Sequence, residues 1–314
     1  MIGLLDPSLG TANSGDIIIS RAVRSLIAEA DIEFKEFSTR APWDRVTRRS
    51  ASGCDFFVMG GTNILTSDPR EYRQWLLGWR DFPAVRKRTV LLGVGWWQYQ
   101  APPTLLGRLF LREALHPAAL HSVRDAFTES MLAYVGLRTT NTACPTMWSL
   151  DGVNSPAVST CSRVVATVTD YARDAQRDIL LLDQLNNMFD EVVIWPQGSQ
   201  DRIYLERLGR REAILPGGLD AYYEALSVPS TAYVGTRLHA GVAALALGVP
   251  SLIVGIDNRA TEIAADTGLP IIQRSSIETL SQRAKQNADK IVLPKENIAR
   301  WRSAFAELLT SDCG

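Results

Sequence analysis

The chain has 314 residues, more than one compact core usually requires, so its length favours two domains. Its 33 basic and 34 acidic residues give a net charge of −1. This balance excludes a general positive field that would attract nucleic acid or an anionic membrane, so any basic site must be local. Hydrophobic residues make up 46% and charged residues 21%, which is typical of globular proteins.

The N-terminal sequence MIGLLDPSLG lacks the basic and apolar regions of a secretory signal. The longest apolar stretch elsewhere, at about residues 240–256, is interrupted by glycine and proline and is too short to span a bilayer. We therefore expect a cytoplasmic protein with no integral membrane segment and no nucleic-acid partner. The cysteines show no metal-binding spacing, so we expect free thiols and no metal site. They are Cys54, Cys144, Cys161 and Cys313.

In the first half, short aliphatic runs alternate with amphipathic stretches, a pattern typical of βα units in a parallel sheet. The strands predicted here are 2–5, 32–37, 55–59, 89–94 and 120–123. The helices predicted here are 16–29 and 126–135, and the aromatic residues between 72 and 79 also have helical spacing.

The second half repeats this alternation. The strands predicted here are 163–169, 191–195, 213–215, 231–234, 250–255 and 269–272. The helices predicted here are 175–189, 221–226, 236–247, 260–266, 277–288 and 296–309. A polar stretch at 151–162 suggests the domain boundary. We expect α/β lobes at 1–152 and 162–290 with a cleft between them, and a C-terminal helix in 291–314. Ligands of such sheets bind at the carboxyl ends of the strands.

Two polar turns follow predicted strands in the first half. Asn13, Gly15 and Asp16 stand between the first strand and the first helix, where Asn13 can cap the helix and the helix N-terminus favours an anion. Gly61, followed by Asn63, ends a buried strand, where glycine suits either a turn with positive φ or the close approach of a ligand. A cap or a turn therefore remains an alternative to ligand binding at both places. Neither motif is a dinucleotide fingerprint or a P-loop.

Aromatic and basic side chains follow two further strands. Trp96 and Trp97 come directly after Gly95, and aromatic rings of this kind can stack on sugars. Packing in the core or between the lobes is the favoured alternative for them. Arg124 lies between a short strand and a helix, where its guanidinium can bind a carboxylate or phosphate. A cap or ion pair with Asp125 is the alternative for this arginine.

The sequence GTRLH at residues 235–239 carries the strongest chemical signal. Of the three histidines, His116 and His121 lie in a predicted loop and strand and are expected to be structural. Arg237 and His239 fall in the first turn of a predicted helix whose continuation is small and apolar, and therefore buried. Two basic groups at a helix N-terminus oppose the helix dipole unless an anion is present. The segment thus predicts an anion-binding site.

Taken in order, these motifs resemble the polysaccharide pyruvyl transferase family. The resemblance is carried by N-x-G-D at 13–16, the glycine turn at 60–61, S-V-R-D at 122–125, T-R-L-H at 236–239 and G-V-P at 248–250. It covers residues 13 to about 270, and its specificity lies in the order and spacing of the motifs. The resemblance implies an α/β enzyme with two Rossmann-like lobes and a central cleft, similar to the GT-B glycosyltransferases.

The resemblance further implies transfer of a pyruvyl group from phosphoenolpyruvate to two hydroxyls of a sugar, forming a ketal without a metal or other cofactor. His239 would be the general acid, and Asp16 would bind the acceptor or act as its base. The acceptor, free or lipid-linked, is expected on the N-terminal lobe and phosphoenolpyruvate on the C-terminal lobe. The substrate-binding residues expected are Arg237, Arg124, Asn13, Gly15, Gly61, Asn63, Trp96, Trp97, Thr236, Asn258 and Arg259.

One segment departs from the family pattern. Many members have a lysine soon after the strand that follows T-R-L-H, where this chain has Asn258 and Arg259. An arginine can replace that lysine as an anion ligand but does not readily release a proton. Two alternatives to pyruvyl transfer remain open. One is a GT-B-type glycosyltransferase that uses a nucleotide-sugar donor, and the other is a non-catalytic relative that binds an anionic ligand.

Overall fold

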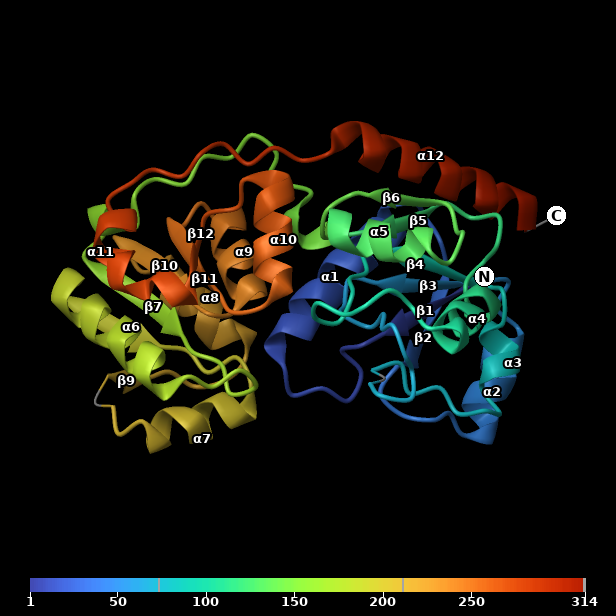
Figure 1. Ribbon diagram of the computed structural model, residues 1–314, viewed down its shortest axis with the longest axis horizontal. Coiled ribbons are helices and arrows are strands. Elements are labelled where there is room, and N and C mark those ends of the chain that lie inside the picture. Colours follow the sequence, from blue (N-terminus) through green and yellow to red (C-terminus); the bar gives the residue numbers. More distant parts are fainter. Residues whose placement is uncertain (73, 211, 313–314) are drawn as a thin grey trace. The chain divides into compact units, whose positions relative to one another are not determined.

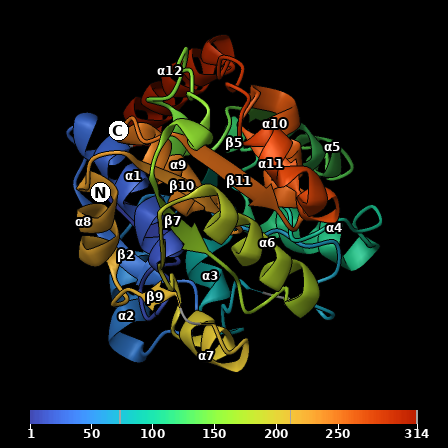
Figure 2. The same cartoon turned by 90° about the vertical axis from the view of Figure 1, so that its left-hand side faces the viewer.

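The computed structural model describes residues 1–72, 74–210 and 212–312. The chain forms two compact units, each built on its own parallel sheet (Figures 1 and 2). Unit 1 comprises Met1–Thr11, Ile19–Trp148 and Leu293–Gly314, and unit 2 comprises Ala12–Ile18 and Ser149–Val292. The sequence predicts lobes that are continuous in the chain, whereas in the structure a short early segment joins unit 2 and the C-terminal helix joins unit 1.

The main sheet of unit 1 is parallel, with the strand order β2-β1-β3-β4, and a two-stranded sheet β5-β6 lies next to β4. This is the order of a doubly wound, flavodoxin-like sheet, whose strand order reverses between β1 and β3. The strands are β1 (Ile2–Asp6), β2 (Phe34–Ser38), β3 (Phe57–Gly60), β4 (Thr89–Leu92), β5 (His121–Val123) and β6 (Thr139–Asn141). Strands β1, β3, β4 and β5 are buried throughout, as expected for a sheet covered on both faces.

Side chains of β5 complete the hydrogen bonding of β4. The N–H of Leu91 donates to Nδ1 of His121 at 3.3 Å, and the N–H of Gly93 donates to Oγ of Ser122 at 2.8 Å. Nε2 of His121 lies 3.0 Å from the carbonyl oxygen of His116, so a neutral ring protonated on Nε2 satisfies both contacts. Burial lowers the pKa of His121 to about 4. This histidine is therefore a structural part of the sheet.

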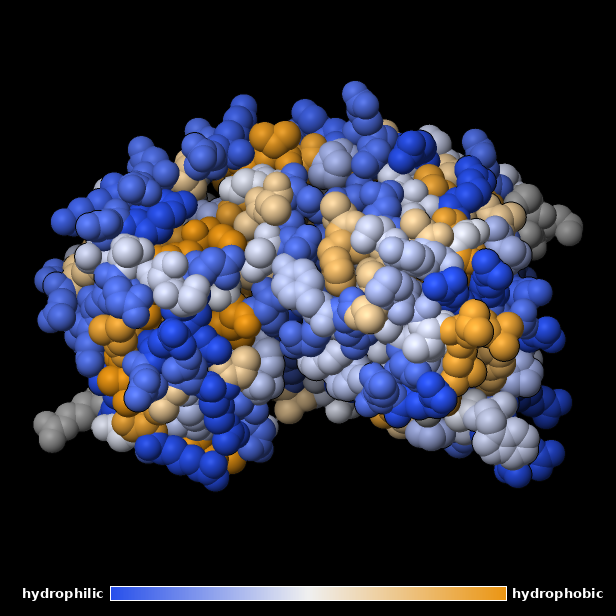
Figure 3. All heavy atoms as spheres, viewed as in Figure 1, coloured by the Kyte–Doolittle hydropathy of each residue, from blue (hydrophilic) through white to orange (hydrophobic). Residues whose placement is uncertain are grey.

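The helices of unit 1 cover the two faces of its sheet, and α4 exposes an unusual row of leucines to solvent. In the space-filling view a group of hydrophobic residues lies over α4 on the right-hand side (Figure 3). The helical elements are α1 (Ser14–Glu29), which begins in unit 2, and α2 (Arg45–Ser52), α3 (Phe82–Val85), α4 (Leu105–Ala114), α5 (Ala126–Ala133), η1 (Pro145–Met147) and α12 (Lys295–Asp312).

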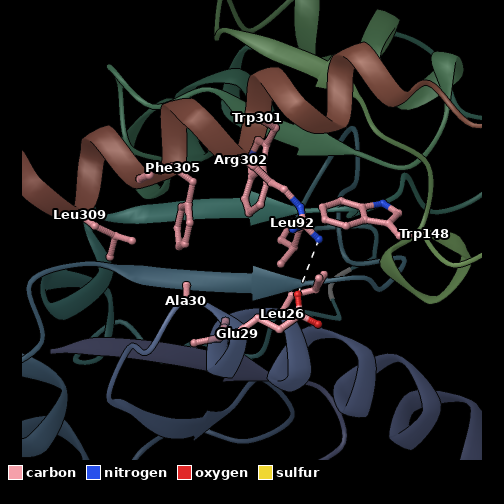
Figure 4. Close-up of a pocket in the computed structure, with 11 residues that line it drawn as sticks. Leu26, Glu29, Ala30, Leu92, Trp148, Trp301, Arg302, Phe305 and Leu309 are labelled. Atoms are coloured by element: carbon pink, nitrogen blue, oxygen red, sulfur yellow. Dashed lines mark ion pairs between the residues drawn. The ribbon is translucent and has the colours of Figure 1, made fainter.

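Helix α12 joins unit 1 because its apolar face is buried there. The ring of Trp301 stacks on that of Phe305 at 4.9 Å, and Phe305 meets Phe56 edge-on at 5.9 Å. Figure 4 shows Trp301, Phe305 and Leu309 directed toward the sheet and α1. An apolar hollow of about 160 Å³ remains between these side chains and α1. Among the described residues that line this hollow, the one ion pair joins Glu29 and Arg302 at 3.8 Å. The lining is otherwise apolar and does not resemble an active site.

Unit 2 contains a six-stranded, wholly parallel sheet in the order β12-β11-β10-β7-β8-β9. Numbered within the unit, this is the Rossmann order 3-2-1-4-5-6, and its switch point lies between β7 and β10. The strands are β7 (Arg163–Thr167), β8 (Glu191–Ile194), β9 (Ala213–Ile214), β10 (Thr231–Gly235), β11 (Ser251–Gly255) and β12 (Ile271–Gln273). Ligands of such sheets bind beyond the carboxyl ends of the strands at the switch point.

Helices cover both faces of this sheet, with α6 and α11 in front of the strands in Figure 2. Alternate residues such as Val164, Ala166 and Val234 form one core with α6 and α11. On the other face, α9 approaches Tyr233 and Ile253 so closely that Gly241 leaves no room for a side chain. The helical elements are η2 (Val158–Thr160), α6 (Ala175–Met188), α7 (Ser199–Arg207), α8 (Leu219–Ser227), α9 (Leu238–Ala246), α10 (Asn258–Thr267), η3 (Arg274–Thr279) and α11 (Leu280–Arg283).

Several predicted elements differ from the structure. Within the predicted helix 277–288, residues 277–283 form the end of η3 and α11, and residues 284–288 are not helical. The aromatic residues between 72 and 79 do not lie on a helix. In that segment Trp75 and Leu77 are buried in the core and Trp79 is 81% exposed, so the spacing there belongs to an irregular segment. The elements that the sequence reading missed are β6, α2, α3, α4 and α7.

Within the described residues, no helix is long and apolar enough to cross a membrane. Three cysteines, Cys54, Cys144 and Cys161, are free thiols. Burial raises the pKa of each, which lowers their reactivity at neutral pH. Cys313 lies outside the described residues.

The buried His121 predicts a loss of stability in mild acid. In the unfolded chain its pKa is near 6.5 and in the folded protein about 4, so the unfolded state takes up the proton first as the pH falls. From about pH 7 to about pH 5, the wild-type protein should lose about 2 kcal/mol more free energy of unfolding than His121→Asn. Urea unfolding at both pH values measures this difference, and parallel losses in the two proteins would contradict it.

Candidate functional site

The candidate site in unit 2 lies at the carboxyl ends of β7, β10 and β11, beside the switch point of the sheet. Asp170 and Tyr171 follow β7, Arg237 follows β10, and Asp257 and Arg259 follow β11. Parallel strands place these segments at one edge of the sheet. The same edge receives the N-termini of α9 and α10, where the helix dipole places partial positive charge.

The turn before α9 is fixed by hydrogen bonds to β7 and β10. The N–H of Thr236 donates to the Thr167 carbonyl at 3.0 Å, and the N–H of Arg237 donates to Oγ1 of Thr167 at 3.2 Å. The Tyr233 hydroxyl donates to the Arg237 carbonyl at 2.8 Å. Arg237 is consequently the extended N-cap residue of α9 rather than part of its first turn. Its side chain leaves a rigidly held point of the backbone.

The anion that the sequence led us to expect beside Arg237 is supplied by the protein itself. Nε of Arg237 donates to Oδ2 of Asp201 at 3.1 Å, and Nη2 binds the other oxygen of this carboxylate and lies 3.3 Å from Asp170. Asp201, in α7, is fully buried and also accepts the N–H groups of Gly198 and Asp170, each at 3.0 Å. Burial raises the pKa of Asp201, whereas Arg237 and these N–H donors lower it.

Two arginines flank the ring of Tyr171. The guanidinium carbon of Arg237 lies 5.1 Å from the ring centre and that of Arg259 lies 5.3 Å from it, both within cation–π distance. Nε of Arg259 also donates to Asp257 at 2.9 Å, and its Nη2 donates to the Tyr171 hydroxyl. Partial burial raises the pKa of Tyr171, although both arginines oppose this. The two cations are thus held in place at the same edge of the sheet.

Each of these arginines keeps one nitrogen available. Nη1 of Arg237 and Nη1 of Arg259 donate no hydrogen bond to any residue that the structure describes. Two buried oxygens that follow the adjacent strands β7 and β8 also lack a hydrogen-bond partner among the described residues. They are Oγ1 of Thr169 and Oε1 of Gln197. Buried oxygens of this kind are costly unless a ligand or water binds them.

The predicted N-x-G-D motif belongs to the same unit. Nε2 of Gln197 donates to Oδ1 of Asn13 at 2.7 Å, and the N–H of Gly15 donates to the same oxygen at 3.1 Å. Asn13 therefore does act in capping α1, which was the alternative to ligand binding. Asp16, in the first turn of α1, is buried and interacts electrostatically with Arg259. The structure thus brings Asp16 and Arg259, far apart in the sequence, to one place.

The remaining predicted residues of unit 2 line the same helix starts. His239 is the second residue of α9 and is 6% exposed, and Asn258 is the buried first residue of α10. Oγ1 of Thr236 is 3.4 Å from the Thr167 carbonyl. Thr236 is therefore engaged with β7 through both its hydroxyl and its N–H, and its role in the structure is to hold the turn.

Arg124 of unit 1 takes the structural arrangement that was its alternative. It is fully buried, and its Nε lies 3.2 Å from Asp125, which also caps α5. Its guanidinium covers Gly95 so closely that a Cβ there would lie 2.2 Å from Cζ, which explains the glycine. Gly61 has φ of +43°, so the turn at the end of β3 requires glycine for its conformation.

The predicted aromatic platform is wrong for Trp96 and still open for Trp97. Trp96 has no exposed surface and forms part of the core of unit 1, because the N–H of Trp96 is held by Oγ1 of Thr128 at 2.9 Å and its ring turns inward. Trp97 is partly exposed, and one face stacks on Tyr72 at 4.2 Å. Asn63 is buried, and its Oδ1 has no hydrogen-bond partner in the part of unit 1 that the structure describes.

Sequence reasoning missed Gln197, which binds Asn13, and the acidic and aromatic partners of the arginines, which are Asp170, Tyr171, Asp201 and Asp257. Four of them directly follow β7, β8 or β11, so the rule that placed Arg237 at a strand end could have found them. Asp201 gave no such signal, because it lies within α7. The sequence of that helix is mostly polar, and its apolar residues are not gathered on one face.

Two solved structures resemble this fold along almost the whole chain. A UDP-GlcNAc 2-epimerase from Methanocaldococcus jannaschii, crystallised with UDP-GlcNAc and UDP, has a TM-score of 0.56 and 10% identity, and the match covers 98% of each chain. S. aureus MnaA with UDP has a TM-score of 0.50 and 9% identity, covering 99% of this chain and 97% of the other. At such low sequence identity, a structural match shows the fold alone. The two matches confirm the predicted fold class, two Rossmann-like α/β lobes of GT-B-like type.

No curated protein matches the chain closely enough to be counted as a relative. The family described as polysaccharide pyruvyl transferase does match, over residues 13–258, a range that begins at the N-x-G-D motif and ends at Asn258. Because this match covers well over half of the sequence, the chain is a transferase that belongs to the polysaccharide pyruvyl transferase family.

Proposed function

We propose that this enzyme transfers the pyruvyl group of phosphoenolpyruvate to two hydroxyls of a sugar and forms a ketal. The sugar belongs to a polysaccharide or its precursor, either free or lipid-linked. The observation that carries the proposal is the placement of Arg237 and His239 at the start of α9, beside the switch point of a Rossmann-type sheet, in a chain of this family. Unit 2 would bind the donor.

The free Nη1 atoms of Arg237 and Arg259 are the proposed ligands of the donor's carboxylate and phosphate. Asp201 and Asp257 offset the charge of these arginines, so attraction of the donor depends on directed N–H groups more than on net charge. The starts of α9 and α10 add further N–H donors. Guanidinium groups that are already held in place lose little freedom when the donor binds.

His239 is the proposed general acid. Its proton would go to the methylene carbon of phosphoenolpyruvate, while a sugar hydroxyl forms a bond to the neighbouring carbon. The bond from that carbon to the phosphate oxygen then breaks, and the second hydroxyl closes the ketal. Of the two hydroxyl protons, one restores His239 and the other leaves with inorganic phosphate. Imidazole suits this exchange because its reference pKa is about 6.5.

For the acceptor sugar, we propose binding residues in both units. Asp16 would accept a hydrogen bond from a sugar hydroxyl or take its proton, and its electrostatic interaction with Arg259 places it at the same end of the sheet as the donor ligands. In unit 1, Asn63 has a buried oxygen that a sugar hydroxyl could satisfy, and Trp97 keeps a partly exposed ring for stacking. The alternative of a nucleotide-sugar donor has only fold-level support, so UDP serves as the comparison ligand.

The donor proposal is tested by thermal-shift titration with phosphoenolpyruvate and, in parallel, UDP. Phosphoenolpyruvate should raise Tm in proportion to the logarithm of its concentration once binding is saturated. Arg259→Gln should weaken its binding about 10- to 100-fold, because a charge-assisted hydrogen bond is lost. Arg177→Gln removes an exposed ion pair of unit 2 with Asp174 and should bind normally. Stabilisation by UDP alone would replace the proposal with the glycosyltransferase alternative.

His239→Gln should lower kcat about 100-fold or more while leaving the affinity for phosphoenolpyruvate within a few-fold, since general acid catalysis contributes about 10²–10⁴. Steady-state kinetics with an acceptor glycan and detection of inorganic phosphate measure this. With wild-type enzyme in D₂O, mass spectrometry should find one deuterium in the new methyl group. His116→Gln is the matched control in unit 1. Full activity of His239→Gln would remove this residue from the mechanism.

Asp201→Asn separates the structural role of the Arg237 pair from donor binding. Breaking a buried ion pair by removing one charge costs about 3 kcal/mol, which urea unfolding should detect. Because Arg237 keeps its guanidinium, phosphoenolpyruvate binding should weaken less than in Arg237→Gln. Isothermal titration of both variants makes the comparison. Equal stability of wild type and Asp201→Asn would show that the pair does not hold the site together.

A further inference from the structure

Helix α4 presents leucines on the face where a surface helix normally carries polar residues. Leu105 is 83% exposed, Leu109 is 58% exposed and Leu106 is 41% exposed. Leu105 and Leu109 are four residues apart and so lie on one outward face. The opposite face, with Leu111 and Ala114, is buried in unit 1. The hydrophobic group over α4 in Figure 3 is therefore additional to the core-facing side of the helix.

Basic side chains surround this apolar row. Arg108 and Arg112 lie on α4 itself, and Arg86 and Lys87 reach the helix by pairing with Glu113 at 2.6 and 3.4 Å. Among the described residues of α4, Glu113 is the one carboxylate, and Arg86 and Lys87 pair with it. The four cations therefore leave a net positive charge around the row, although the whole chain is nearly neutral.

A further exposed apolar residue belongs to the segment that packs on α4. Trp79 is 81% exposed and lies three residues before Phe82, whose ring stacks on Phe110 of α4 at 5.8 Å. Arg80 lies over the Trp79 ring at 4.8 Å. Exposed tryptophan, arginine and leucine are the composition of surfaces that lie at the boundary between lipid headgroups and acyl chains.

We propose that α4 docks unit 1 onto an anionic lipid surface, with Leu105 and Leu109 entering the interface and the surrounding cations contacting the headgroups. Positive charge around an apolar row is complementary to an anionic bilayer. It is not complementary to a second copy of the same positive row. Three leucines on one helix also expose far less than the ~800 Å² per partner that a stable protein interface requires.

The test is co-sedimentation with vesicles of phosphatidylcholine alone or mixed equally with phosphatidylglycerol. Wild-type protein should sediment with the mixed vesicles, much less with phosphatidylcholine, and less at high salt. Leu105→Ser/Leu109→Ser should lower the partition coefficient for the mixed vesicles at least tenfold and leave Tm unchanged. The control, Leu247→Ser/Val292→Ser, removes apolar residues of unit 2 that are 56% and 61% exposed, and should bind as wild type does.

Three results would overturn the proposal. They are equal binding by wild type and the α4 variant, no binding of wild type to either vesicle, and a dimer of wild type, without vesicles, that the α4 substitutions abolish. Because Leu105 and Leu109 are not part of the donor site, both proteins should bind phosphoenolpyruvate equally. A failure of lipid binding is thereby distinguished from a failure of the proposed function.

Discussion

The ion pair between Arg237 and Asp201 is the interaction on which the arrangement of unit 2 depends. It joins the turn after β10 to α7, and both side chains are buried. A buried charge is costly to desolvate, and a well-matched partner with further hydrogen bonds offsets that cost. Here the carboxylate also accepts the N–H groups of Gly198 and Asp170, so the segments after β7 and β8 are held to the same point.

This pair changes what an arginine at the start of α9 implies. A cation there suggests a bound anion when only the sequence is known, because it opposes the helix dipole. In the structure that anion is Asp201, so the position of Arg237 is fixed before any substrate arrives. What remains for a ligand is the outward nitrogen of a pre-oriented guanidinium. Pre-orientation of this kind favours a ligand that binds in one geometry. It contributes less to the long-range attraction of an anion, because Asp201 offsets the charge of Arg237.

The sequence predicted the elements whose pattern is local and left out those that depend on tertiary contacts. Buried strands such as β7 and β11 contain short uninterrupted runs of aliphatic or β-branched residues, and the turn at Arg237 follows from its place at a strand end. Helix α7 was missed because its buried residues, among them Tyr204 and Asp201, are dispersed in a polar sequence. Trp96 was read as a possible platform because sequence position places a residue at a strand end without fixing which way its ring points.

The same contacts account for arginine at position 259, where many members of the family have lysine. A planar guanidinium can lie over the Tyr171 ring while its nitrogens bind Asp257 and the tyrosine hydroxyl. A lysine ammonium has neither the plane nor the fixed fork to make these contacts together. Tyr171 and Asp257 thus form a setting suited to arginine, and they keep its charge fixed at neutral pH. In the mechanism we propose, the movement of protons consequently falls to His239 and Asp16, with Arg259 as a permanent cation.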